Sequence, residues 1–236
     1  MPWSLSFPPE PQHWILACTQ MHISFGDPAK TEQLRTDVGV ARKIAMAAIL
    51  FQPAFDGFMP TNIPPTTMTG WNVKEHARLY PILESCKDPN EIWNLLKKQE
   101  DVEGVNKVVT NNRPNLKKFF INLKGKQYST IEARFWPFPR TREFVPDCTY
   151  FIGVFINKVL AIDEEKLDRL ASKPTNWNTI AKEVYGLTEA PKPKEGAHSL
   201  KHLKTFLSGT HRIDDAFWKR MEEHRLLLED FLSPLA

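Results

Sequence analysis

The segment from Ser129 to Pro137, with the sequence STIEARFWP, places a glutamate and an arginine two residues apart. Side chains of a β-strand alternate between its two faces, so Glu132 and Arg134 are predicted to share one face. The same alternation predicts Thr130 and Trp136 on that face. A carboxylate beside a guanidinium is either a structural ion pair or a metal ligand next to a phosphate-binding cation. The function of the chain depends on which of the two it is.

A second candidate for chemistry is His22, which stands two residues before Ser24 in the sequence MHIS. Residues 13–25 contain apolar residues followed by polar alternation, which predicts a strand with His22 and Ser24 on one face. A histidine at the end of a strand is either a hydrogen-bonded structural residue or a metal ligand.

The elements that must position these residues are strands and helices in the first two thirds of the chain and helices alone in the last third. Residues 117–124 and 129–137 are predicted to be antiparallel neighbours, joined by a turn at Gly125-Lys126. Asp27 is predicted to cap the first helix, with Pro28 at its first position. Helices are predicted at 28–52, 73–86, 90–99, 147–162, 164–172, 179–185, 199–207 and 214–232. Together these elements predict an α+β fold, an antiparallel sheet with packed helices and a helical C-terminal third.

Two of the predicted helices have sequences that indicate burial. Residues 147–162 are apolar almost all round, so this helix is expected in the interior. In the last helix a packing stripe with spacings of four and three is formed by Phe217, Met221, His224, Leu228 and Phe231. A basic, proline-containing segment at 190–197 precedes the last two helices. We therefore predict an α+β body at 1–189 and a linker with C-terminal helices at 190–236.

The composition limits the classes of function. The 236 residues are 42% hydrophobic, which is enough for one sizeable core. A formal net charge of +3 argues against a nucleic-acid binder held mainly by bulk charge. Basic segments at 117–126 and 192–204 leave an RNA-associated role as the weakest alternative.

The cysteines and the apolar runs indicate a compartment. Cys18, Cys86 and Cys148 match neither a zinc site nor a disulfide framework, which favours a reducing environment. No apolar run reaches the roughly 18 residues of a membrane helix, and the N-terminal segment lacks the basic region of a secretory signal. We therefore expect a cytoplasmic protein that does not enter a membrane.

Several short motifs, taken in chain order, resemble one known family. The H-x-S strand at His22 is followed by an alanine-rich helix ending in F-x-P-x-F-x-G, by Asn-Leu before a turn, by T-I-E-A-R and by the apolar run YFIGVFI. Over residues 13–162 this order is similar to the C-terminal part of the glutamate–cysteine ligase and amidoligase group. Those enzymes are carboxylate–amine ligases with a glutamine-synthetase-like fold.

The resemblance implies ATP-dependent ligation of a small-molecule carboxylate to an amine through an acyl phosphate. His22 and Glu132 would be ligands of the Mg ions of ATP, and Arg134 would be the catalytic cation that contacts phosphate. Arg140, which follows the strand, is a further candidate for binding the nucleotide. The residue types suit this chemistry, because magnesium prefers oxygen ligands and bridges phosphates, and arginine binds phosphate oxygens with two N–H groups.

The family also has an earlier strand with paired glutamates, E-x-E, which this sequence lacks. Three explanations stay open: a fragment or half of a split enzyme whose partner chain brings the missing strand, a degenerate relative that binds without catalysing, or a coincidental resemblance. The alternative function is a non-catalytic interaction or assembly protein derived from that fold. In that case the edge of the His22 strand would pair with a partner chain.

Overall fold

Helices dominate the part of the chain that the computed structural model describes, which comprises residues 18–24, 27–58, 82–92, 121–123, 130–137, 141, 144–171, 176–192 and 196–232. The strands are β1 (Cys18–Ile23), β2 (Ile121–Leu123) and β3 (Ile131–Pro137). The helices are α1 (Pro28–Thr36), α2 (Val38–Asp56), α6 (Phe144–Leu160), α7 (Glu164–Ala171), α8 (Trp177–Glu183), α9 (Gly196–Phe206) and α10 (Asp215–Leu232). Residues 82–85 and 89–92 are also helical.

The predicted α+β fold class is wrong, because the described part of the chain is 70% helical. Strands are limited to segments of 6, 3 and 7 residues. The central strand β3 buries Ile131 and Ala133 completely, but three such short strands offer too little apolar surface to form a core. The core is therefore made by helices, and the small sheet lies against them.

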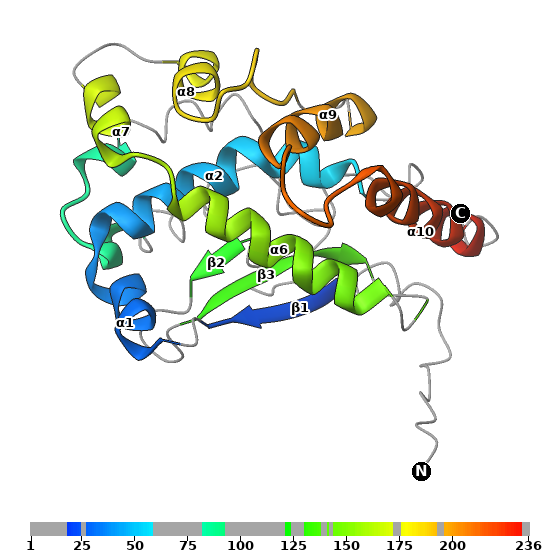
Figure 1. Ribbon diagram of the computed structural model, residues 1–236. Coiled ribbons are helices and arrows are strands. Elements are labelled where there is room, and N and C mark those ends of the chain that lie inside the picture. The colour runs from blue at the N-terminus through cyan, green and yellow to red at the C-terminus, as the bar shows by residue number, and fades with distance from the viewer. Residues whose placement is uncertain are drawn as a thin grey trace, which may run out of the picture.

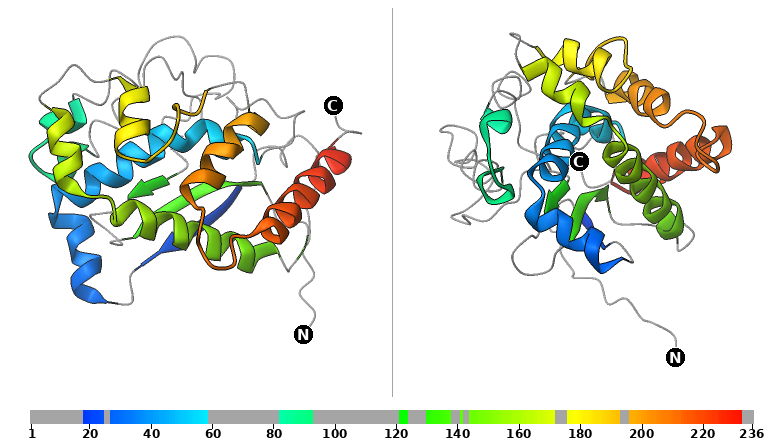
Figure 2. Two further views of the ribbon diagram at one scale, coloured as in Figure 1. Left: turned by 45° about the horizontal axis from the view of Figure 1, so that its top comes forward. Right: turned by 60° about the vertical axis from the view of Figure 1, so that its left-hand side comes forward.

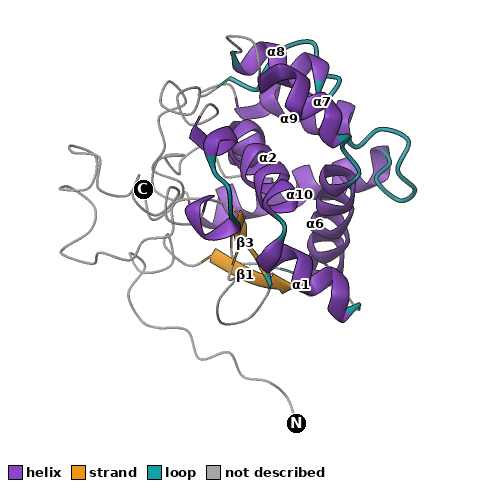
Figure 3. Cartoon of the chain, turned by 90° about the vertical axis from the view of Figure 1, so that its left-hand side faces the viewer, coloured by secondary structure: helices purple, strands orange, loops and turns teal. Residues whose placement is uncertain are grey.

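The molecule has three layers, and the sheet forms one of the two outer layers (Figure 1). Its strand order is β1-β3-β2, and both neighbouring pairs are antiparallel. Helices α2 and α6 lie over one face of the sheet, and α7, α8 and α9 lie beyond them (Figures 1 and 3). Helix α10 packs beside the N-terminal half of α6 (Figure 2), where Arg220 Nε donates to Asp147 Oδ2 over 2.6 Å.

The helix predicted over residues 28–52 is broken in two at Asp37. The N–H group of Asp37 donates to the carbonyl of Gln33 over 2.9 Å and closes α1. Its carboxylate accepts from the N–H groups of Gly39 and Val40, at 2.8 and 3.2 Å, and opens α2. One aspartate therefore serves both helix ends. At the start of α1 the predicted cap is confirmed, because Asp27 accepts from a backbone N–H of the first turn.

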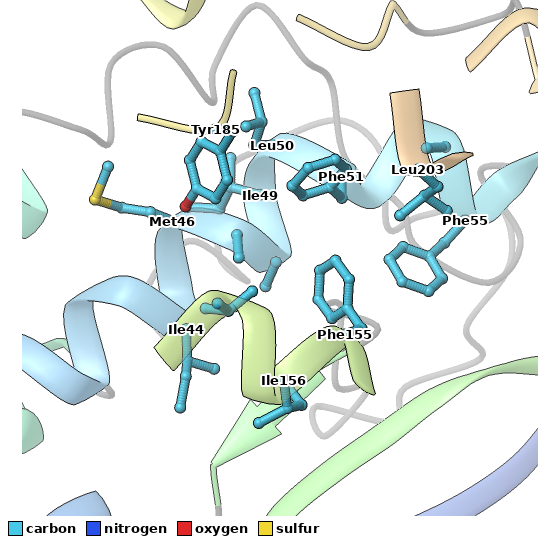
Figure 4. Close-up of a cluster of buried hydrophobic side chains, with 14 of the residues drawn as sticks. Ile44, Met46, Ile49, Leu50, Phe51, Phe55, Phe155, Ile156, Tyr185 and Leu203 are labelled. Atoms are coloured by element: carbon cyan, nitrogen blue, oxygen red, sulfur yellow. The ribbon is translucent and has the colours of Figure 1, made fainter. Parts of the chain in front are cut away.

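Helix α2 is the centre of the core (Figure 4). Phe155 of α6 meets Phe51 and Phe55 of α2 edge to face, with ring centroids 5.4 and 5.2 Å apart. Tyr185, which follows α8, meets Phe51 in the same way at 5.4 Å, and Leu203 of α9 is fully buried in this cluster. Edge-to-face pairs contribute about 0.5–1.5 kcal/mol each beyond the area they bury. The two helical layers are thus joined through one aromatic cluster.

The C-terminal helices contribute to the same hydrophobic core. Residues Leu203 of α9 and Phe217 of α10 belong to one cluster with α2 and α6. The predicted packing stripe of α10 is confirmed at Phe217, Met221, His224 and Leu228, which are all buried. The ring of His224 stacks on that of Phe144, with centroids 3.4 Å apart.

Arg42 of α2 satisfies backbone carbonyls at the end of the helical residues 82–85. Its guanidinium donates to the carbonyl oxygens of Leu83, Glu84 and Cys86 at 3.2, 3.3 and 3.0 Å. The last carbonyls of a helix have no partner within that helix and carry partial negative charge, so a cation is favoured there.

Two lysines act in the same way at other helix ends. Lys43 Nζ lies 3.4 Å from the carbonyl oxygen of Leu160, where α6 ends. Lys158 Nζ donates to the carbonyl oxygens of Phe206 and Ser208, each at 2.9 Å, where α9 ends. These cations connect helices that are distant in sequence.

Among the described residues no single helix is long and apolar enough to cross a membrane. Helices α6 and α7 reach that length and composition only as a pair bent by 64°. The apolar residues of α6 are packed into the core, as its sequence predicts.

Candidate functional site

The antiparallel register brings the two predicted metal ligands opposite each other. His22 of β1 pairs with Glu132 of β3, and Glu132 pairs on its other side with Asn122 of β2. We call these three positions, His22–Glu132–Asn122, the cross-strand row. Directly opposed positions of antiparallel strands share a face, with Cβ atoms roughly 4.5–5.5 Å apart. Three residues from three strands are thus neighbours in the sheet.

The cross-strand row belongs to the face of the sheet that points away from the helices. On β3 the flanking residues Ile131 and Ala133 are fully buried, so alternation assigns position 132 to the other face. On β1 Met21 and Ile23 pack partly against the core, whereas His22 is exposed. The sheet therefore separates an apolar inner face from a polar outer face.

One hydrogen bond on the outer face connects β1 with the residue that precedes β3. His22 Nδ1 lies 3.1 Å from Thr130 Oγ1, and the direction of the bond depends on the tautomer of the imidazole. Thr130 is half-buried and stands directly before the fully buried Ile131. The exposed imidazole is thus attached to a well-anchored part of the sheet.

The alternation of β3 is interrupted beyond Ala133. Thr19 pairs with Trp136 and Met21 with Ala133, so β3 has one residue more than β1 over this interval. Trp136 pairs with Thr19, but its side chain lies outside the described part of the structure, so the prediction that it shares a face with Glu132 stays a prediction. Such a β-bulge bends its strand and increases the local twist, and bulges are frequent next to functional sites.

The two predicted phosphate-binding arginines are placed only in part. Position 134 lies in the interval that contains the bulge, and the side chain of Arg134 is outside the described part of the structure. Arg140 lies outside the described residues altogether. Their roles as phosphate contacts stay predictions.

The described cysteines do not provide a nucleophile. Cys86 and Cys148 are free thiols, and both are buried. Burial raises the pKa of the Cys148 thiol far above its ordinary value, and the neighbouring Asp147 carboxylate adds to this. Burial and the Glu91 carboxylate also raise the pKa of the Cys86 thiol. A thiol that stays protonated is a poor nucleophile, so covalent thiol chemistry is not supported at these two residues.

The cross-strand row contains residue types that can ligate a metal, but the side chains of Glu132 and Asn122 lie outside the described part of the structure. Within the described residues no three His, Cys, Asp or Glu side chains cluster in a way that could hold a metal ion. Magnesium, however, is usually held by one or two carboxylates together with phosphate oxygens and waters. A row that offers one glutamate, one histidine and one asparagine position fits that type of binding.

Comparisons with known proteins give no relative. No protein-family model matches the chain, and no curated protein and no solved structure matches it either. The similarity to the amidoligase group therefore rests on the short motifs of the sequence.

The sequence did not indicate Asn122 or Thr130 as members of the site. The alternation of the strand predicts Thr130 on the same face as Glu132 but assigns no role to it. Asn122 could have been found only from the register of β2 with β3.

Proposed function

We propose that this chain is part of an ATP-dependent carboxylate–amine ligase and that it binds Mg-ATP on the outer face of its sheet. The observation that supports this most is the register of His22 opposite Glu132. The family resemblance assigns metal binding to these same two residues. Because β1 and β3 are far apart in sequence, no local motif enforces their alignment.

Each residue has a separate task in this proposal. Glu132 and His22 hold the metal, and Arg134 binds the phosphate oxygens that the metal leaves exposed. When bound, Mg-ATP supplies the phosphoryl group that activates the substrate carboxylate for attack by an amine. The acidic strand that the sequence lacks would come from a partner chain, and β1 is an outer strand of the described sheet, next to which such a strand could add.

Calorimetric titration of the full chain with Mg-ATP tests the proposal. Wild type is expected to release or absorb heat with one-site stoichiometry. Glu132→Gln keeps the shape of the residue but removes the charge, and Arg134→Ala removes the guanidinium, so both should weaken binding at least tenfold. Glu165→Gln, a change at an exposed carboxylate of α7, is the matched control and should bind as wild type does.

Two results would overturn the proposal. One is the absence of any heat with wild type, both alone and after mixing with a candidate partner chain that has an E-x-E strand. The other is a Glu132→Gln variant that binds Mg-ATP as tightly as wild type.

The position of β1 favours a second candidate, a non-catalytic assembly protein. In the sheet that the structure describes, β1 is an outer strand, and the β-bulge leaves its middle irregularly paired. An outer strand presents backbone N–H and C=O groups to which another chain can add.

Sedimentation of the purified chain distinguishes this candidate. Assembly through β1 predicts a complex larger than one chain, no affinity for Mg-ATP, and dissociation by Gln20→Pro, since proline removes a backbone donor. Gln20 is suited to this test because it lies where the ladder is already irregular. A monomer that binds Mg-ATP would exclude the assembly role.

A further inference from the structure

We propose that Met21 is a site of reversible oxidation, at which hydrogen peroxide converts the thioether to a sulfoxide that accepts a hydrogen bond from the hydroxyl of Thr149. Met21 lies in β1 and Thr149 lies in α6, so the modification changes a contact between the sheet and the helical layer next to it. This inference goes beyond the proposed ligase function and is independent of it, because it involves neither a nucleotide nor a metal.

Met21 is more accessible than the other methionines whose burial the structure describes. Met46 of α2 is fully buried, and Met221 of α10 is 3% exposed. Met21 is half-buried and packs against the core only in part. Oxidants in solution reach an exposed thioether more readily than one inside a core. Among these three methionines, Met21 is therefore expected to be oxidised first.

The sulfur of Met21 lies next to a hydroxyl group. Thr149 Oγ1 is 3.7 Å from Met21 Sδ, within reach of a weak hydrogen bond to sulfur. The same hydroxyl is 2.9 Å from the carbonyl oxygen of Val145, one turn earlier in α6. A hydroxyl donates a single proton, and a carbonyl oxygen is a better acceptor than a thioether. In the reduced protein the proton is therefore expected to point to Val145, and the sulfur is the weaker, second acceptor.

Oxidation reverses this order of acceptors. A lone pair of the sulfur attacks one oxygen of hydrogen peroxide, the O–O bond breaks, and the departing hydroxide takes the proton of the transferred oxygen and leaves as water. The thioether is thereby oxidised to a polar sulfoxide, and the peroxide is reduced. The carbonyl of Val145 loses little when the hydroxyl turns to the sulfoxide oxygen, because a helical carbonyl also accepts from the N–H group four residues later.

The surroundings of Met21 allow the polar form. The register of β1 with β3 shifts between Thr19 and Met21, so the ladder is already irregular at this point. A polar group at the border of a core is costly unless it is hydrogen-bonded. Thr149 is exposed, so its hydroxyl can turn without displacing buried atoms. Thr149 thus provides for the oxidised form a donor that the reduced form uses only weakly.

Peroxide treatment of the full, folded chain tests the site. Tandem mass spectrometry of its peptides should show that Met21 gains one oxygen about tenfold faster than Met46 and Met221, and that methionine sulfoxide reductase removes this oxygen. Equal rates at the three methionines, or a sulfoxide at Met21 that the reductase cannot reduce in the folded chain, would overturn the proposal.

Thermal unfolding of the reduced and the oxidised chain tests the hydrogen bond. Thr149→Val has nearly the same shape but no hydroxyl, and Thr149→Ser keeps the hydroxyl. Because Thr149 is exposed, neither change should alter the melting temperature of the reduced chain much. Oxidation should lower the melting temperature of Thr149→Val by about 2–4 °C more than that of wild type, and Thr149→Ser should behave as wild type does.

A second substitution identifies the methionine that is responsible. Met21→Leu removes the sulfur and keeps the apolar volume. In this background the additional fall caused by Thr149→Val after oxidation should disappear. If the additional fall persists, it comes from another methionine, and the proposal is wrong. If wild type and Thr149→Val lose the same amount on oxidation, the sulfoxide does not accept from Thr149, and the proposal is wrong as well.

Discussion

The helical layers and the outer face of the sheet use polar side chains in different ways. In the helical layers Arg42, Lys43 and Lys158 end on backbone carbonyls where other helices stop. On the outer face of the sheet, His22 bonds to another side chain, Thr130, across two strands. The first arrangement compensates backbone groups that every helix leaves open, and so it has a structural reason.

This difference predicts which substitutions change the stability of the fold and which change the binding of a ligand. A helix-capping cation stabilises the fold whether or not a ligand is present. A polar side chain that is exposed on a sheet, as His22 is, adds little to the stability of the fold, because water would make its contacts equally well. Substitutions in the two regions should therefore change different measured quantities.

The largest effect is expected at the centre of the aromatic cluster. Phe155→Ala removes the ring between Phe51 and Phe55 and should lower the free energy of unfolding by about 3–5 kcal/mol, since it leaves a cavity in a fully buried site. Urea unfolding followed by circular dichroism measures this loss. Phe155→Leu is the matched control, and its free energy of unfolding should fall clearly less than that of Phe155→Ala. A loss below about 1 kcal/mol for Phe155→Ala would mean that the aromatic cluster contributes little to the packing between the two helical layers.

The next effect is expected at Arg42. Arg42→Met keeps the aliphatic part of the side chain but leaves the carbonyls of Leu83, Glu84 and Cys86 without their donors. The loss should be about 2–3 kcal/mol in urea unfolding, because hydrogen bonds to charged groups contribute more than neutral ones. Arg42→Lys keeps the charge without the planar fork and should lie between wild type and Arg42→Met. Equal free energies of unfolding for Arg42→Lys and wild type would show that the positive charge alone, and not the planar guanidinium, provides the stabilisation.

A smaller, pH-dependent effect is expected at Glu84. Burial raises the pKa of its carboxyl, the Arg42 charge opposes this, and Asp168 adds to it. A folded-state pKa above the unfolded one means that the protonated form stabilises the fold, and that this contribution is lost as pH rises through the folded pKa. Glu84→Gln should therefore gain stability relative to wild type as pH rises from 4 toward 7, as followed by thermal unfolding at stepped pH. An unchanged difference across this range would contradict the raised pKa.

The smallest change in stability is expected on the outer face of the sheet. His22→Ala should shift the free energy of unfolding by no more than about 0.5 kcal/mol, as exposed substitutions usually do. Ile131→Ala, on the inner face of the same sheet, is the control and should cost about 2–5 kcal/mol because Ile131 is fully buried. Parallel titration with Mn²⁺ should show the reverse order, with binding lost in His22→Ala. Large destabilisation by His22→Ala would remove the contrast between the two faces.

Local chemistry was predictable from the sequence where neighbouring residues determine it. The cap at Asp27 and the buried stripe of α10 follow from hydrogen bonding and helical spacing within a few residues. The break at Asp37 was missed, because apolar residues on both sides continue a helical period across it. The fold class was wrong because polar alternation indicates a strand without indicating how short it is.

The arrangement of the candidate site was less predictable, since it depends on register. His22 and Glu132 were recognised from motifs, but their pairing depends on how β1 and β3 align around the bulge. The position of Asn122 opposite Glu132 depends on the length of the connection between β2 and β3. A connection of another length would place a different residue opposite Glu132. Neither property is encoded in the few residues around each motif.

The central position of α2 also determines when the fold can be completed during synthesis. This helix ends at Asp56, whereas Phe155, Leu203 and Phe217, which share its cluster, are made much later. At ribosomal speeds of about 5–20 residues per second, the intervening chain takes on the order of 10 s to appear. For that time an almost wholly apolar helix lacks the partners that bury it in the folded protein, a condition in which nascent chains aggregate or recruit chaperones. Among the core helices that the structure describes, α2 is therefore made before α6, α9 and α10, and it stays without these partners for the longest time.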